Sequence, residues 1–155
     1  MNLKRGIAMK KGIALTIIML VLIIIAFLSE KPNNYQYIFT GEGDYWKAEY
    51  VSKGTETWEK EDDRTTYSNE HSDVLILTYT GSLKDISSKK LEYSYQTNSS
   101  SGSSTREFTN ERTFKHRSGG NGAIVRENEI IQVNVKWDDQ EESFELTNKS
   151  LKKIE

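Results

Sequence analysis

The fold is indicated most clearly by residues 131–146, whose sequence is IQVNVKWDDQEESFEL. Apolar and polar side chains alternate over residues 131–137, so an extended strand here has one apolar face and one polar face. The polar residues 138–140 then turn the chain, and Phe144 and Leu146 supply a returning apolar face. This stretch predicts an antiparallel β-hairpin. The apolar face of its first strand consists of Ile131, Val133, Val135 and Trp137.

Shorter patterns of the same kind recur between residues 34 and 130, separated by polar segments. Lys53-Gly54 predicts a turn between two strands, the charged residues 61–73 an exposed connection, and the Ser- and Gly-rich residues 98–105 a mobile loop. With about eight strands and no long helical periodicity, the sequence predicts an all-β fold, an antiparallel β-sandwich of immunoglobulin-like general architecture. The other predicted strands are residues 34–39, 44–52, 55–60, 74–80, 91–96 and 106–115.

The N-terminal region has a different character, because residues 12–28 are uncharged and strongly apolar. As a helix these 17 residues are about 25 Å long, at the lower edge of what spans a hydrocarbon core of about 30 Å. Four basic residues precede the segment, and positive charge stays on the cytoplasmic side. We therefore expect a cytoplasmic N-terminus and an extracytoplasmic C-terminal part. The basic residues are Lys4, Arg5, Lys10 and Lys11.

Residues 12–28 also have the length of the apolar region of a cleaved signal peptide, and a buried core helix is a further reading. Signal peptidase requires small residues before the cut, whereas Ile24 and Phe27 occupy the relevant positions. The chain has no cysteine that could carry a lipid. An uncleaved, single-pass transmembrane signal anchor in the cell membrane is favoured. The predicted organisation is a basic lead (1–11), the anchor (12–28), a linker (29–33), the extracytoplasmic domain (34–148) and a tail (149–155).

The charge of the exposed part limits its partners. Five of the 21 Lys and Arg and one of the 23 Asp and Glu lie in residues 1–31, which leaves 16 basic and 22 acidic residues beyond them, a net charge of −6. Such a domain repels phosphate polymers on average, so no nucleic-acid partner is expected. Without cysteine, disulfides, thiolate chemistry and sulfur-ligated metals are excluded.

No grouping of residues indicates catalysis or a bound cofactor. Ser residues lack a Gly-x-Ser-x-Gly context, and the adjacent pairs Asp62-Asp63 and Asp138-Asp139 are typical of turns. A calcium site is one alternative for the acidic segment around residue 61, because clustered oxygens bind calcium in extracellular modules. A solvated acidic turn is the other. The candidate metal ligands are Glu59, Glu61, Asp62 and Asp63.

The candidate binding residues are an aromatic side chain, a histidine and a basic cluster. Trp58 lies between polar residues, so it is the tryptophan with a predicted surface role. His71 is flanked by acidic residues and could join them in binding a ligand. The basic cluster could meet an anionic lipid head group or wall polymer, or it could protect the edge of a strand. It comprises Arg112, Lys115, His116 and Arg117.

Four short stretches carry a resemblance: residues 41–50 (GEGDYWKAEY), 77–84 (LTYTGSLK), 133–137 (VNVKW) and 142–146 (ESFEL). In them the chain resembles small membrane-anchored or lipoprotein-like extracytoplasmic proteins of low-GC Gram-positive, Bacillus-type bacteria. The resemblance implies a β-sandwich at the membrane surface and transfers no site residues. Many such proteins begin with a lipid-modified cysteine, which is absent here.

These observations favour a non-enzymatic binding or interaction module, tethered to the membrane through residues 12–28. Its expected partner is another cell-surface protein or a wall component, and no cofactor is expected. A module that senses calcium or a wall ligand is the second hypothesis, and a hydrolase the third.

Overall fold

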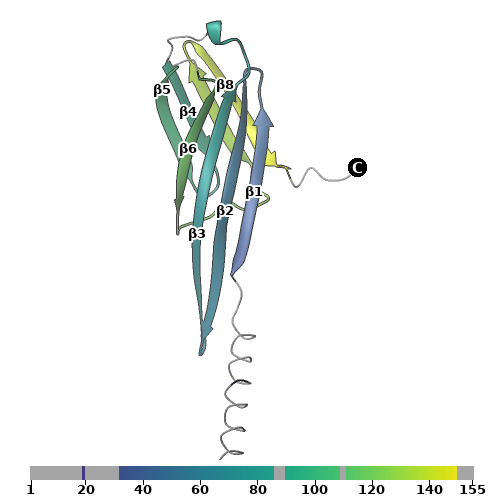
Figure 1. Ribbon diagram of the computed structural model, residues 1–155, viewed down its shortest axis with the longest axis vertical. Helices are drawn as coiled ribbons and strands as arrows, with labels where there is room; N and C mark the ends of the chain where they lie inside the picture. Colours follow the sequence, from purple (N-terminus) through teal and green to yellow (C-terminus); the bar gives the residue numbers. More distant parts are fainter. Residues whose placement is uncertain (1–18, 20–31, 86–89, 109–110, 150–155) are drawn as a thin grey trace, which may run out of the picture. The chain divides into compact units, whose positions relative to one another are not determined.

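The computed structural model describes Met19 and residues 32–85, 90–108 and 111–149. Within these residues it contains eight β-strands and one short 3-10 helix (Figure 1). The prediction of an all-β antiparallel domain is therefore confirmed. In chain order the elements are β1 (Asn33–Glu42), β2 (Trp46–Glu61), β3 (Arg64–Tyr79), η1 (Leu83–Asp85), β4 (Lys90–Gln96), β5 (Ser101–Glu107), β6 (Thr113–Gly120), β7 (Ile131–Trp137) and β8 (Gln140–Asn148).

The predicted membrane anchor, residues 12–28, lies outside the described residues apart from Met19. In the part of the chain that the structure describes, no helix has the length and apolar character needed to cross a membrane. The anchor therefore stays a prediction from the sequence.

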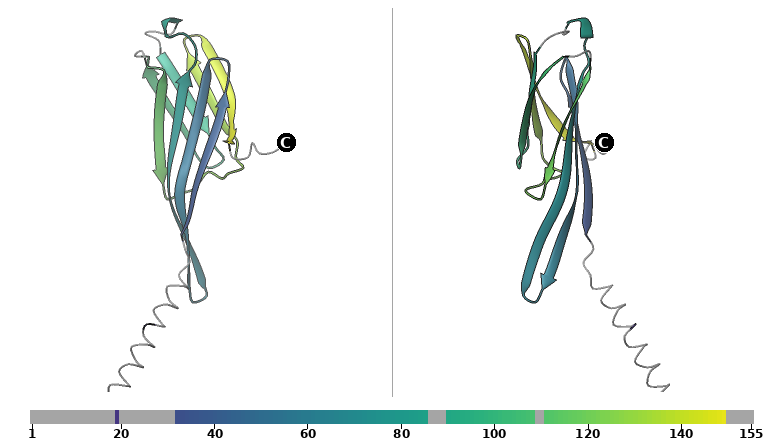
Figure 2. Two further views of the ribbon diagram at one scale, coloured as in Figure 1. Left: turned by 45° about the vertical axis from the view of Figure 1, so that its right-hand side comes forward. Right: turned by 60° about the vertical axis from the view of Figure 1, so that its left-hand side comes forward.

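All eight strands belong to one sheet with the order β5-β4-β7-β8-β1-β2-β3-β6. Its two halves join at β8 and β1, where Phe39 pairs with Asn148 and Thr40 with Thr147. The halves face each other across a common core, so that the sheet is barrel-like and nearly closed (Figure 2). Because the strands form one continuous sheet, the finer prediction of a two-sheet, immunoglobulin-like sandwich is not confirmed.

The described chain divides into two compact units, which we treat separately. The larger unit contains Asn33–Glu56 and the residues from Ser68 onward, and it holds the hydrophobic core. The smaller unit includes Thr57–Tyr67, where the ends of β2 and β3 form a hairpin.

The core is built from the inward-facing residues of each strand, because successive side chains of a strand point to opposite faces. Trp46 lies at its aromatic centre and is fully buried. Its ring centroid lies 5.1 Å from that of Tyr79, 5.8 Å from Trp137, 5.9 Å from Phe108 and 6.2 Å from Phe114. These rings come from β2, β3, β6, β7 and the segment between β5 and β6, so the core links both halves of the sheet.

The hairpin predicted from residues 131–146 is confirmed as β7 and β8. The register pairs Ile131 with Leu146 and Trp137 with Gln140. The turn is therefore one residue shorter than predicted, because Gln140 already belongs to β8. Asp138 has a φ of 54°, in the left-handed region that Asp tolerates better than most residues.

The predicted turn at Lys53-Gly54 is wrong, since both residues lie inside the 16-residue strand β2. Gly54 allows the neighbouring strands to pack closely against β2 and does not turn the chain. A side chain there would approach the hydroxyl of Tyr35 to 2.7 Å and the Cα of His71 to 3.0 Å. The predicted exposed connection at 61–73 is also wrong: its turn is Asp62-Asp63 alone, and β3 begins at Arg64.

Most of the Ser- and Gly-rich segment is a strand rather than the predicted loop, since only residues 98–100 lie outside the strands. Residues 101–107 form β5, which pairs with β4 from Gln96–Ser101 to Lys90–Glu107. The ring of Tyr95 lies over Gly102, its register partner, where a side chain would approach the ring Cζ to 2.7 Å. The predicted strand at 106–115 is divided, because β5 ends at Glu107 and β6 begins at Thr113.

Candidate functional site

The most exposed aromatic surface in the hairpin end of β2 and β3 is formed by Trp58 and Tyr67. Their side chains are 50% and 37% exposed, and their ring centroids lie 4.6 Å apart with planes inclined by 49°. Trp58 thus has the surface position that the sequence predicted. Tyr67 was missed, although both residues lie four positions from the Asp62-Asp63 turn and therefore face each other across the hairpin.

The hairpin forms because its sequence suits an exposed, extended ribbon. Threonines occur on both strands, and threonine favours β structure even when little of its surface is buried. Asp62 adopts a φ of 50°, which allows a two-residue turn. The aromatic pair then supplies a cross-strand contact in a segment without a hydrophobic core of its own.

Charged side chains of both signs lie between the two aromatic residues in the chain, toward the turn of the hairpin. All are exposed, and they include the four residues predicted as possible calcium ligands. Among the described residues, no group of three or more His, Cys, Asp or Glu side chains is placed to hold a metal ion. The acidic candidates therefore form part of a mixed-charge rim. The rim consists of Glu59, Lys60, Glu61, Asp62, Asp63 and Arg64.

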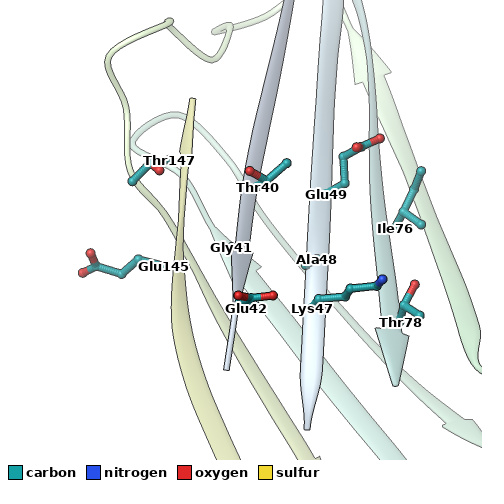
Figure 3. A pocket seen from close by; sticks show the side chains of 10 residues that line it. All are labelled: Thr40, Gly41, Glu42, Lys47, Ala48, Glu49, Ile76, Thr78, Glu145 and Thr147. Atoms are coloured by element: carbon teal, nitrogen blue, oxygen red, sulfur yellow. The ribbon is translucent and has the colours of Figure 1, made fainter. Parts of the chain in front are cut away.

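A second surface feature is a hollow of about 670 Å³ over the outer face of β8, β1, β2 and β3 (Figure 3). It brings together three carboxylates, three threonine hydroxyls and one ammonium group, and Glu42 lies opposite Lys47 in the register. Sequence patterns could not reveal it, because its residues come from four strands. The lining residues are Thr40, Gly41, Glu42, Lys47, Ala48, Glu49, Ile76, Thr78, Glu145 and Thr147.

His71, a candidate binding residue, lies on the inner face of β3 rather than in the expected polar connection. Its side chain is 10% exposed, and its Nε2 lies 3.6 Å from Oδ2 of the buried Asp73. Burial, together with the nearby Asp73 carboxylate, raises the pKa of the Tyr50 phenol well above its ordinary value. His71 is thus part of a buried polar cluster and is not available to a large partner.

This cluster contains several buried polar atoms that make no hydrogen bond within the described structure. Four of them belong to neighbouring positions on β2 and β3: Tyr50 Oη, Ser52 Oγ, His71 Nδ1 and Asp73 Oδ1. An unsatisfied buried group lowers stability, and the aromatic core contains one as well, Nε1 of Trp46.

The basic candidates lie at one end of the sheet order, on or beside β6. Lys115 and Arg117 are exposed and share one face of the strand, whereas Arg112 precedes it and donates from Nη1 to the carbonyl oxygen of Gly81 at 2.6 Å. His116 points inward, with its ring centroid 5.5 Å from that of Tyr95. Lys115 and Arg117 therefore lie on the last strand in the sheet order.

Compared with known proteins, the chain matches no family model, no curated protein and no solved structure. The Trp58–Tyr67 pair combines large apolar rings with exposure to solvent, and none of the other features above does so.

Proposed function

We propose that this chain is a membrane-anchored, extracytoplasmic binding module without enzymatic activity, and that it contacts a protein partner through the Trp58–Tyr67 pair. The observation that carries the proposal is the exposure of two aromatic rings that contact each other near the end of a hairpin, with planes inclined by 49°. Trp and Tyr are the residues most enriched among those that dominate binding energy in protein interfaces.

The surroundings of the pair have the composition of an interface. Aromatic residues at the centre and polar residues at the rim are typical of protein–protein contacts. Here the rim residues carry both signs of charge, which can select one partner over others through complementary pairs. Residues on a narrow hairpin can also enter a recess in a partner.

The inclination of the rings favours a protein over a wall glycan. Stacking on a sugar ring needs a flat aromatic platform, whereas the planes of Trp58 and Tyr67 are inclined by 49°. A wedge of two rings fits better between the side chains of a protein.

The location of the module is proposed from the sequence. The apolar residues 12–28, preceded by four basic residues, support a single span with the N-terminus in the cytoplasm. Because the chain has no cysteine, single cysteines can report its orientation. We expect a membrane-impermeant maleimide to label Asn121→Cys in intact cells, and Asn2→Cys only after permeabilisation. The reverse pattern would contradict the orientation.

Contact through the aromatic pair can be tested with a photo-crosslinking amino acid placed at position 58 of the full chain in intact cells. The expected result is a discrete adduct of higher mass that Tyr67→Ala abolishes. Tyr45 provides a matched control position, because it is 47% exposed but lies outside the hairpin. The same adducts from position 45, or an adduct at position 58 that persists in Tyr67→Ala, would reject the hairpin as the contact surface.

A further inference from the structure

Strand β6 ends the sheet on one side, and its outer edge is unpaired. On its inner edge, β6 pairs with β3 over eight consecutive positions, from Thr113–Thr78 to Gly120–His71. In the sheet order β6 has no second neighbour. Within the described residues, no backbone hydrogen bond outside the ladders involves residues 113–120.

The free edge is long and regular enough to accept another strand. In an antiparallel ladder, alternate residues direct their N–H and C=O groups away from the paired neighbour. The pairing of β6 with β3 continues without a bulge, and the single proline of the chain, Pro32, lies elsewhere. Two common devices that block an edge, a bulge and a proline, are therefore absent from β6. The third device, charged side chains, is present as Lys115 and Arg117 and opposes a basic strand rather than an acidic one. The strand also ends in Gly119-Gly120, which places no bulky side chain beside the edge.

The charge on this edge is positive and uncompensated. Lys115 and Arg117 are exposed on the same face of β6, and neither takes part in an ion pair within the described residues. They belong to a domain whose net charge is negative. An added strand would place its own side chains directly opposite these two cations.

We propose that the outer edge of β6 binds an extended acidic peptide segment of a partner protein by adding it to the sheet as a further strand. Main-chain hydrogen bonds supply affinity in this mode, and carboxylates at alternate positions pair with Lys115 and Arg117. A second copy of β6 is a poorer occupant, because antiparallel pairing centred on His116 places Lys115 of one copy opposite Arg117 of the other. An anionic lipid or phosphate polymer would use the cations but leave the backbone groups of the edge unpaired.

The proposal is tested with the full chain in nonionic detergent and a fluorescent synthetic peptide of alternating glutamate and valine. Saturable binding is expected, with slower hydrogen exchange of the β6 amides. Arg117→Glu is expected to weaken binding by about tenfold. Lys53→Glu, which reverses an exposed cation on β2, is the matched control and should leave binding unchanged. Circular dichroism checks that both variants are folded.

A second peptide separates strand addition from attraction between charges. It has the same sequence but carries N-methyl groups on alternate amides, which remove main-chain hydrogen bonds and keep every carboxylate. We expect it to bind at least about tenfold more weakly. Equal binding of the two peptides would overturn the proposal. So would failure of the unmodified peptide to bind when phosphatidylglycerol vesicles bind through Lys115 and Arg117, which would assign the edge to lipid.

Discussion

The guanidinium group of Arg126 contacts both carboxylate oxygens of Glu56, with Nη1 lying 3.0 Å from Oε1 and 3.1 Å from Oε2. Glu56 lies on β2 and is 7% exposed, whereas Arg126 belongs to the segment between β6 and β7 and is 51% exposed. Glu129 extends the connection: its carboxylate accepts hydrogen bonds from the backbone N–H of Arg126 at 2.8 Å and of Asn98 at 3.0 Å. The side chains of Glu56, Arg126 and Glu129 thus hold the segment before β7 against the sheet.

Loss of this ion pair is expected to destabilise the domain. Glu56→Gln removes the charge of the buried partner of this ion pair. We expect the free energy of unfolding to fall by about 1–2 kcal/mol. The exposed pair of Lys136 and Glu141 is the matched control, because water screens it and Lys136→Met should leave the free energy of unfolding nearly unchanged. Thermal unfolding of the full chain measures both variants. Equal losses of stability in the two variants would mean that the burial of Glu56 does not strengthen its ion pair.

The buried phenol of Tyr50 predicts sensitivity to alkali. Burial and the Asp73 carboxylate raise its pKa in the folded state, whereas an unfolded tyrosine ionises near pH 10. This raised pKa contributes stability that is fully present below about pH 10 and is lost as the pH rises further, because only the unfolded chain then releases the proton. Tyr50→Phe should therefore flatten the fall of the unfolding temperature above about pH 10.

The effect of the same substitution at neutral pH is expected to be small. The Tyr50 hydroxyl makes no hydrogen bond within the described structure, so its removal should change stability by less than about 1 kcal/mol. Tyr45→Phe removes an exposed phenol and is the control for the alkaline measurement. An unchanged alkaline profile in Tyr50→Phe would assign the sensitivity to other groups.

Gly41 allows β1 and β8 to approach at the junction of the two halves of the sheet. A Cβ atom there would collide with the backbone carbonyl of Glu145, and backbone cannot move aside cheaply. We expect Gly41→Ala to lower the free energy of unfolding by about 1–3 kcal/mol or more. Gly122→Ala is the control, because an added Cβ meets no atom within 4 Å. Urea unfolding that gave the two variants equal midpoints would contradict the role of this junction.

The turn of the β2–β3 hairpin should be improved by glycine. Asp62 has a φ of 50°, a left-handed conformation that is strained for residues with a side chain. Asp62→Gly is expected to stabilise the hairpin by about 0.5–1 kcal/mol, and Asp62→Val to destabilise it by more than that. Hydrogen exchange of the amides of Thr57 and Thr66 would follow the change locally. Faster exchange in Asp62→Gly would be the opposite of this expectation.

The strands that cover the core were predictable from their own residues. Val133 and Val135 alternate with polar residues, and only one register places both of them inside. The hairpin end around Trp58 gave no such signal, because its strands bury little apolar surface and so need no alternation. Strand β5 was missed for a related reason: backbone pairing with β4 and the ring of Tyr95 over Gly102 hold it, rather than apolar side chains of its own.

The candidate sites likewise include residues that the sequence indicated and residues that only the folded structure revealed. Trp58 stood out because it lies among polar residues, but its partner Tyr67 follows only from the position of the turn. The sequence suggested that His71 is an exposed ligand beside acidic residues. In the structure it lies on the inner face of β3, because it is separated from the buried Asp73 by two positions and alternate residues of a strand share a face.

The sequence by itself determined the all-β antiparallel class and the β7–β8 hairpin, because the alternation of apolar and polar side chains can be read from the order of neighbouring residues. Tertiary structure alone decided that β8 joins β1 in one nearly closed sheet and that β6 ends it with a free edge. It also decided that Trp58 meets Tyr67. These relationships depend on pairing between residues distant in the chain, which hydrogen bonding and packing fix only when the whole domain folds.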